Sequence, residues 1–163
     1  MTQLDKKRRL ARNNAWRLLR SRPRSEFEIR TRLKEGGYDD SIVNDLVEEL
    51  RLSGDIDDGK FARFWMESRM HSNPVGDIVL KQELKQKGVS ESIIEATLEA
   101  KAKSYDEYEV AFNMAQDHFE RLKKLDRRKA AKRLYDFLAR RGFAFATVQG
   151  VIEKLVNVSY EDR

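Results

Sequence analysis

The chain has 163 residues, of which 37% are charged and 40% hydrophobic, and its formal net charge is +5. An apolar fraction of this size can build a core, which argues against an intrinsically disordered protein. The absence of cysteine excludes a disulfide framework, a cysteine-ligated zinc site and a thiol nucleophile. No apolar run approaches the roughly 18 residues of a membrane span, and the basic N-terminus lacks the apolar stretch of a signal peptide. We therefore expect a soluble cytoplasmic protein.

Basic and acidic residues alternate in blocks along the chain. Residues 1–34 hold 12 Lys or Arg against 3 Asp or Glu, and residues 123–141 hold 9 against 2. Residues 35–60 reverse this balance, with 2 basic and 9 acidic residues. Such blocks favour a polyanion or a charged protein as partner, although each block can also be the solvated face of a helix.

The first two helices are predicted from apolar spacing and from caps. Apolar residues of segment 6–21 recur with a helical period, and Pro23 ends this helix. Ser25 and Glu28 form a capping box, which predicts the start of a second helix. The buried face of this helix is predicted to consist of three apolar residues, Phe27, Ile29 and Leu33.

Three predicted helix ends share one pattern: a leucine, a glycine four residues later, and an apolar or aromatic residue directly after the glycine. The members are Leu33, Gly37 and Tyr38; Leu84, Gly88 and Val89; and Leu138, Gly142 and Phe143. A glycine in the left-handed conformation ends a helix at little steric cost. The residue after it can then pack on the next helix as a hydrophobic staple. The pattern therefore predicts a sharp corner between two helices, and it occurs three times.

This recurrence predicts an all-α fold of three tandem three-helix repeats, without a sheet, forming an elongated and curved array. The first repeat takes residues 1–55 with a basic N-terminal helix, the second 56–104, and the third 105–163 with a C-terminal tail. Further helices are predicted over about 58–72 and 106–122. Pro74 is placed at the start of the helix that follows the first of these, because its missing N–H would be unpaired there.

The residue types that catalysis needs are sparse. His71 and His118 stand alone on different predicted helices, and a lone histidine is most often a packing or surface residue. The chain has no phosphate-binding glycine loop, no dinucleotide fingerprint and no nucleophile elbow. The acidic pair Glu48-Glu49 is interpreted as a solvated face, and the pair Asp57-Asp58 as a helix cap. We expect no catalytic site, no metal site and no cofactor.

Candidate binding residues are more numerous, and the second repeat supplies three of them. Lys81 and Lys85 lie one helical turn apart, with Lys87 close by. Like charges at this spacing cost a few tenths of a kcal/mol in an isolated helix. A penalty of this kind is consistent with a binding ridge.

The third repeat carries a larger basic group: Lys123, Lys124, Arg127, Arg128, Lys129, Lys132, Arg133, Arg140 and Arg141. Part of it is predicted to be structural, because Lys132, Asp136 and Arg140 are spaced to neutralise one another at i, i+4. The rest can hold phosphates without reading sequence. The aromatic residues beside this group have the spacing of core residues, so base stacking is not expected there.

One stretch of the second repeat is distinctive. It reads Ile56-Asp57-Asp58, Phe61-Ala62 and Arg69, followed by Gln82-Glu83-Leu84-Lys85-Gln86-Lys87-Gly88-Val89. This stretch is similar to the most characteristic segment of the bacterial RecX regulatory proteins, and residues 25–33 and 134–143 resemble the flanking segments of that family. One departure is Gly76-Asp77-Ile78-Val79, where the family usually has Gly-Pro followed by two often basic residues. The departure makes the lysines at 81, 85 and 87 the better contact candidates.

The resemblance implies a non-enzymatic, modular helical regulator of homologous recombination, DNA repair and the SOS response. Members of this family bind the RecA protein and lie in the groove of the RecA–DNA filament. They limit filament extension or promote disassembly, and so inhibit the ATPase, strand-exchange and coprotease activities of RecA. The expected partners are therefore RecA and the RecA–single-stranded DNA filament, with weak sequence-independent DNA binding and no membrane, and we expect a monomer.

The candidate contacts with RecA or DNA are basic residues: Arg69, Lys81, Lys85, Lys87, Arg127, Arg128, Lys132, Arg133, Arg140 and Arg141. An alternative function remains open on the sequence. The sharp corners could act as helix-turn-helix units of an autonomous DNA- or RNA-binding module. The two hypotheses differ in whether RecA or naked nucleic acid is the target.

Overall fold

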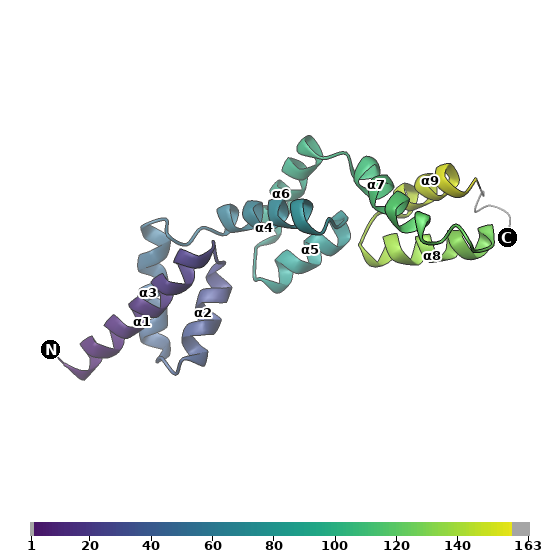
Figure 1. Ribbon diagram of the computed structural model, residues 1–163. Coiled ribbons are helices and arrows are strands. Elements are labelled where there is room, and N and C mark those ends of the chain that lie inside the picture. The colour runs from purple at the N-terminus through teal and green to yellow at the C-terminus, as the bar shows by residue number, and fades with distance from the viewer. Residues whose placement is uncertain (1, 158–163) are drawn as a thin grey trace. The chain divides into compact units, whose positions relative to one another are not determined.

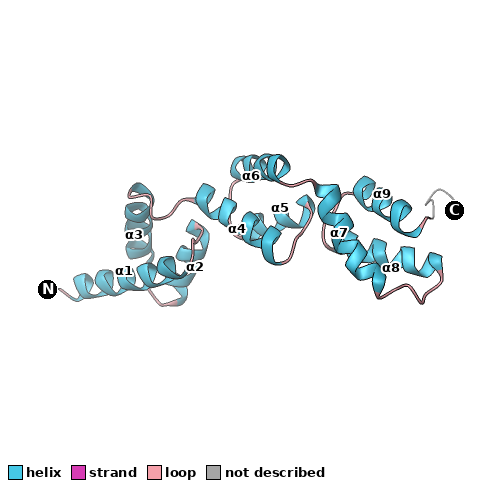
Figure 2. Ribbon diagram, turned by 45° about the horizontal axis from the view of Figure 1, so that its top comes forward, coloured by secondary structure: helices cyan, strands magenta, loops and turns pink. Residues whose placement is uncertain are grey.

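The computed structural model describes residues 2–157, and every regular element in this range is an α-helix (Figure 1). Loops and turns join the helices, and the described range has no strand (Figure 2). Its nine helices are α1 (Gln3–Ser21), α2 (Glu26–Glu35), α3 (Asp40–Leu52), α4 (Asp58–Ser72), α5 (Asp77–Gln86), α6 (Glu91–Ser104), α7 (Glu107–Glu120), α8 (Arg127–Arg140) and α9 (Phe145–Val156). The predicted all-α fold is confirmed. Within residues 2–157, no helix is long and apolar enough to cross a bilayer.

Contacts between residues group the described chain into two compact units. Unit 1 consists of residues 2–65 and 84–97, and unit 2 of residues 66–83 and 98–157. Helices α4, α5 and α6 therefore each contribute residues to both units. The repeat boundaries after residues 55 and 104 stay a prediction.

The core of unit 1 follows the predicted helical spacing. Ala11 and Ala15 of α1 and the pair Ile29 and Leu33 of α2 are buried in one cluster with the apolar face of α3. Phe27, which is predicted to share the buried face of α2, is instead 52% exposed. It lies two residues from Ile29, and this spacing turns its side chain to a different side of the helix.

The three corner glycines have the same backbone geometry. Gly37, Gly88 and Gly142 have φ angles of +77°, +74° and +79°. In each corner the glycine N–H donates to the carbonyl three residues earlier, and the next N–H donates to the leucine carbonyl five residues earlier. This pair of hydrogen bonds is the Schellman motif, which satisfies carbonyls that a helix end would otherwise leave unpaired.

The corner glycines differ in what surrounds them. A Cβ atom at Gly37 would meet nothing within 4 Å. A Cβ at Gly88 would lie 2.5 Å from Cβ of Phe27, and one at Gly142 would lie 2.5 Å from the backbone nitrogen of Val79. Two of the three corners are therefore packed so closely against another helix that only glycine fits without a shift.

The segment between α4 and α5 does not begin a helix at Pro74. Helix α5 starts at Asp77 instead. The N–H of Gly76 donates to the carbonyl of Arg141 at 2.8 Å, and that of Ile78 donates to the carbonyl of Gly142 at 3.2 Å. The prediction for Pro74 is wrong, because the residues before Asp77 remain outside the helix and the segment bonds to the α8–α9 corner.

Candidate interaction surfaces

Helix α8 of unit 2 has one buried side and one strongly basic side. Its buried residues are Ala130, Ala131, Leu134 and Leu138. Its first turn is capped by Asp126, whose Oδ2 accepts the backbone N–H of Lys129 at 3.3 Å. Six of its basic residues are exposed: Arg127, Arg128, Lys129, Lys132, Arg133 and Arg140. All but Lys129 are among the predicted contact residues.

The exposed cations of α8 have no carboxylate within 4.0 Å in the described part of the chain. The predicted ladder of Lys132, Asp136 and Arg140 is therefore not formed; Asp136 is half-buried while the two cations face solvent. Arg127 and Arg128 lie in the first turn, where the helix macrodipole also disfavours positive charge. An anionic partner would offset the repulsion among these cations and the unfavourable interaction of Arg127 and Arg128 with the helix dipole. This effect would weaken as the salt concentration rises.

Arg141 follows Arg140 directly but is held inside unit 2. Its Nη1 donates to Oδ1 of Asn73 and, at 3.5 Å, to the carbonyl of Pro74. Its guanidinium carbon lies 5.3 Å from the ring centre of Phe137. Of these two neighbours, Arg140 is available to a partner, whereas Arg141 ties the end of α8 to the segment before α5.

The basic residues predicted as contacts in the second repeat are engaged to different degrees. Arg69 forms a two-point ion pair with Glu83, with Nη2–Oε1 at 2.9 Å and Nε–Oε2 at 3.1 Å. Lys81 is half-buried. In unit 1, Nζ of the exposed Lys85 lies 3.0 Å from Oε2 of Glu91. These lysines and this arginine are not a row of free cations.

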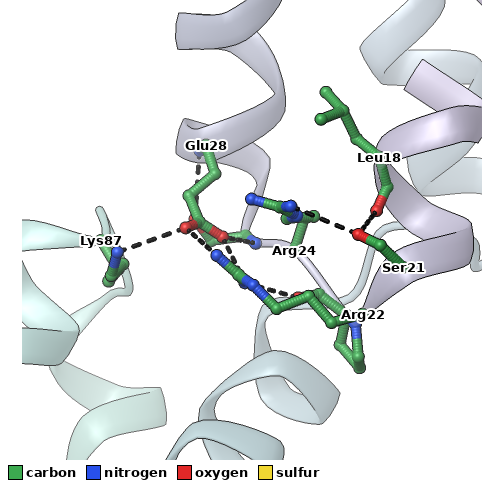
Figure 3. A network of polar contacts seen from close by, with 8 residues as sticks. Leu18, Ser21, Arg22, Arg24, Glu28 and Lys87 are labelled. Carbon is green, nitrogen blue, oxygen red and sulfur yellow. Dashed lines mark hydrogen bonds and ion pairs between the residues drawn. The ribbon is translucent and has the colours of Figure 1, made fainter. Parts of the chain in front are cut away.

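Lys87 belongs to a network in unit 1 that is centred on Glu28 (Figure 3). Arg22 Nη2 lies 2.8 Å from Oε1 of Glu28, and Lys87 Nζ lies 3.2 Å from the same oxygen. The other oxygen accepts the backbone N–H of Ser25 at 3.3 Å, which closes the predicted capping box. Burial by itself raises the pKa of Glu28, but the hydrogen bonds and charges of Arg22 and Lys87 outweigh it and hold the pKa below its ordinary value.

Trp65 of α4 supports this network from one side. Nζ of Lys87 lies 4.8 Å from its ring centre, and the guanidinium carbon of Arg22 lies 5.9 Å away. Both distances allow cation–π attraction. We refer to Arg22, Glu28, Trp65 and Lys87, with the close approach of Gly88 to Phe27, as the first joint, because they fasten the end of α5 to the start of α2.

The acidic pair Asp57-Asp58 caps two different helices of unit 1. Oδ1 of Asp57 accepts the backbone N–H of Lys60 at 2.9 Å, within its own helix. Oδ1 of Asp58 accepts the backbone N–H of Glu26 at 2.9 Å, at the first residue of α2. Burial raises the pKa of Asp58. The predicted helix cap is thus present, and Asp58 adds a further contact to the first joint.

A second joint occurs in unit 2 and fastens the end of α8 to the start of α5. It consists of Arg141 with Asn73 and Pro74, the close approach of Gly142 to Val79, and Glu107. Glu107 is the first residue of α7 and lies near Asp77, the first residue of α5. Burial, then the nearby Asp77 carboxylate, raises the pKa of Glu107.

A buried lysine that the sequence did not predict forms an ion pair beside this joint. Lys101 of α6 is only 2% exposed, and its Nζ lies 2.6 Å from Oδ1 of Asp77. A buried lysine needs such a partner, so Asp77, the departure noted in the sequence, supplies it. Helical periodicity could have indicated the burial of Lys101. It lies seven residues after Ile94 and four after Thr97, both buried, on the same face of α6.

The two histidines have unrelated surroundings. His71 is exposed. The ring of His118 stacks on Phe137 with 4.3 Å between ring centres. Burial first, then the charges of Arg121 and Arg140, lowers the pKa of His118. His118 therefore packs on Phe137 as an aromatic ring. No cluster of three or more His, Cys, Asp or Glu able to hold a metal occurs between residues 2 and 157.

Three family models match the chain one after another. Residues 11–50 match the first three-helix domain of RecX, residues 57–98 the second and residues 105–152 the third. The three-helix organisation predicted from the recurring corners is thereby confirmed.

Individual relatives extend this match over most of the chain. The regulatory protein RecX of Chlorobium phaeobacteroides is 36% identical over 141 residues, which cover 86% of this chain and 90% of the relative. That of Prosthecochloris aestuarii is 34% identical over 152 residues, or 93% and 97% of the two chains. The crystal structure of RecX from Lactobacillus salivarius has a TM-score of 0.79 at 18% identity, covering 94% of this chain and 99% of that one. At this identity the structural likeness supports the fold alone.

Proposed function

Because the chain belongs to the RecX family of regulatory proteins, we propose that it regulates the RecA recombinase. It binds RecA and the RecA–single-stranded DNA filament in the filament groove, and it inhibits the ATPase, strand-exchange and coprotease activities of RecA. Inhibition results from limited filament extension or from faster disassembly. The observation that carries this proposal is the match to all three RecX three-helix domains in order. The protein acts in the cytoplasm, in recombination and DNA repair, without catalysing a reaction.

The exposed face of α8 supports the proposal with a surface of suitable chemistry. A filament of protein on DNA offers both carboxylates and phosphates, and guanidinium groups such as those of Arg128 and Arg133 can bind either in a two-point geometry. These arginines already extend into solvent without a carboxylate within 4.0 Å in the described range. Long-range attraction by such a face speeds association and weakens as salt rises.

The basic residues of the two joints have a different role in this proposal. Lys87 and Arg141 are committed to partners inside their units, so they hold helices in place rather than contact RecA. Arg69, paired with Glu83, belongs with them. Contact is assigned to α8, with Lys85 as a weaker candidate because an acidic partner already neutralises it.

The test is the rate of ATP hydrolysis by RecA on single-stranded DNA as the protein is added below stoichiometric amounts. The expected result is a dose-dependent fall in rate. Repeating the titration with extra single-stranded DNA controls for simple sequestration of DNA, which the extra DNA would reverse. An unchanged hydrolysis rate at every protein-to-RecA ratio would remove the proposal.

The same α8 face also keeps the second hypothesis in view, since unpaired cations suit naked nucleic acid as well. A helix-turn-helix module would bind one duplex sequence tightly in the absence of RecA. Duplex binding that is weak, indifferent to sequence and steeply salt-dependent would count against this alternative.

A further inference from the structure

Helix α1 carries seven basic residues, which the structure divides into two groups. Three of them pair with carboxylates of α3 and its cap: Lys7 Nζ with Asp39 Oδ2 at 3.3 Å, Arg8 Nη2 with Asp45 Oδ2 at 2.9 Å, and Arg12 Nη2 with Glu49 Oε2 at 2.6 Å. The other four are exposed and have no carboxylate within 4.0 Å in the described range: Lys6, Arg9, Arg17 and Arg20.

The four unpaired cations share one side of α1. Together with Asn13 they recur at intervals of three or four residues, which places Lys6, Arg9, Asn13, Arg17 and Arg20 in one line, here called the α1 stripe. The side buried in the core carries Ala11 and Ala15 and faces the opposite way. From its first to its last residue the stripe is about 21 Å long, given a rise of about 1.5 Å per residue.

Trp16 borders the stripe and is open to solvent. Its side chain is 37% exposed, although tryptophan is a costly residue to leave in water. It lines a hollow of about 470 Å³ with its neighbours Asn13, Arg17, Arg20 and Ser21. By contrast, Lys87 and Arg22 lie over the ring of Trp65. No ring or cation of residues 2–157 lies on Trp16 in this way, so the exposed part of its ring has no such partner within the described chain.

A second hollow, of about 270 Å³, also reaches Trp16 and is lined in part by Arg20 and Arg24. Arg24 donates from Nη2 to Oγ of Ser21 at 3.3 Å, and its buried Nε has no hydrogen-bond partner in the described range. Asp55 and Asp57 line this hollow as well, and their charge disfavours a phosphate within it. Phosphate contacts are therefore assigned to the α1 stripe. The second hollow is assigned to the polar edge of a base.

We propose that the α1 stripe and Trp16 form a binding site for single-stranded nucleic acid. One unpaired base stacks on the indole of Trp16, the adjacent phosphates contact Arg17 and Arg20, and the strand continues toward Arg9 and Lys6. An aromatic platform within a line of cations binds single strands without reading their sequence, because every base has a face to stack. A base inside a duplex cannot stack in this way, so single strands are preferred. This site goes beyond the proposed regulation of RecA, and its test uses no RecA, so either proposal can fail alone.

The stacking part is tested by fluorescence anisotropy of a labelled 15-nucleotide oligo(dT) titrated with the protein alone. Trp16→Ala should weaken binding by about 5- to 100-fold, the usual effect of removing one stacking residue. On an abasic strand of the same length, Trp16→Ala and the unchanged protein should bind equally, because no base is left to stack. Trp16→Phe should restore most of the affinity for oligo(dT). Oligo(rU) measured in parallel shows whether RNA is held as well as DNA.

The electrostatic part has a matched control on the same helix. Arg17→Ala/Arg20→Ala should reduce the slope of log K against log salt concentration by about 1.4, since each phosphate contact to a single strand contributes about 0.7. Arg8→Ala/Arg12→Ala removes the same charge from the paired side of α1 and should leave the slope unchanged. Circular dichroism of each variant verifies that the helices are intact.

Three results would overturn the inference. The first is that Trp16→Ala binds oligo(dT) as tightly as the unchanged protein does, or that it weakens binding to the abasic strand as much as binding to oligo(dT). The two double variants could lower the salt slope equally, which would mean that net charge alone is sensed. A 15-base-pair duplex could bind more tightly than the single strand.

Discussion

The first and second joints place the same three features at equivalent positions of the chain. Each has a basic residue directly before a corner glycine, a close approach of that glycine to another helix, and an acidic residue at the first position of a helix. These are Lys87, Gly88 and Asp58 in unit 1, and Arg141, Gly142 and Glu107 in unit 2. At the third corner, Gly36 stands directly before Gly37, where the joints have a basic residue, and a Cβ at Gly37 would meet nothing within 4 Å. This corner, which forms no joint, therefore lacks both the cation and the close approach.

The chemistry of the two joints differs. Lys87 meets the carboxylate of Glu28, so the first joint depends on ionisation. Arg141 meets an amide oxygen of Asn73, a backbone carbonyl and the ring of Phe137, none of which titrates. The residue before the corner glycine is therefore a cation that contacts another helix or loop in both joints. The chemical group that it contacts determines whether the stability of the joint depends on pH. The exposed cations of α8 are the contrasting class, since they form no ion pair or side-chain hydrogen bond within the described chain.

The largest expected effect separates a corner with a joint from one without. Gly142→Ala should lower the free energy of unfolding by about 2–5 kcal/mol, the sum of left-handed strain and overlap with Val79. Gly37→Ala carries the same strain but meets nothing within 4 Å, so it should cost only about 1–2 kcal/mol. Urea unfolding followed by circular dichroism measures both. Equal losses would show that the close approach at Gly142 has no energetic weight.

Removing the carboxylate of the first joint should have the next largest effect. Glu28→Gln keeps the shape but loses the charge that Arg22 and Lys87 share, and should cost about 1–3 kcal/mol at neutral pH. The matched control is Glu48→Gln, which breaks an exposed pair with Arg51 and should leave the urea midpoint unchanged. If both variants have the same urea midpoint, the ion pairs of Glu28 contribute no more to stability than an exposed surface ion pair does.

The same variant gives a pH dependence with a fixed sign. The folded state holds the pKa of Glu28 below that of the unfolded chain, which is about 4.3. Its stabilisation is therefore complete above about pH 5 and is lost as pH falls through the folded-state pKa. The difference in unfolding free energy between the protein and Glu28→Gln should shrink on acidification. Taking this difference cancels the opposite contributions of Asp58 and Glu107, whose raised pKa values favour the folded state at low pH.

The smallest expected effect on stability is at α8. Arg141→Ala should cost about 1 kcal/mol, because it removes hydrogen bonds from a partly exposed charged group. Arg140→Ala, one residue earlier, should leave the urea midpoint unchanged, because no hydrogen bond or ion pair within the described chain is lost. A loss of stability in Arg140→Ala similar to that in Arg141→Ala would contradict the division between joint cations and exposed cations.

The sequence predicted features whose causes are local. The caps at Ser25 and Asp57 and the three glycine corners depend on a few adjacent residues, so their patterns could be recognised directly. The joints depend on residues far apart: Lys87 and Glu28 are separated by 59 positions, and nothing near Lys87 indicates its partner. Lysines and arginines that look alike in sequence therefore could not be divided into joint and contact residues.

Exposure was the other feature that the sequence left open. Trp16 directly follows the core residue Ala15, and its residue type alone does not show that it is 37% exposed at the edge of the α1 stripe. Lys101 is the converse, a charged residue at core spacing that is buried because Asp77 pairs with it. Periodicity gives the face of a helix, whereas the depth of burial depends on which other helix covers that face.

The proposed contact between the exposed cations of α8 and RecA, without a part for the joint cations, can be measured. It is tested most directly by titrating RecA ATPase on single-stranded DNA with Arg128→Ala/Lys132→Ala/Arg133→Ala and with Lys87→Met, at a temperature where both are folded. We expect the α8 variant to need about ten times more protein for half-inhibition, with an unchanged unfolding midpoint. Lys87→Met should inhibit normally despite a lower midpoint. Normal inhibition by the α8 variant, together with loss of inhibition in folded Lys87→Met, would contradict it.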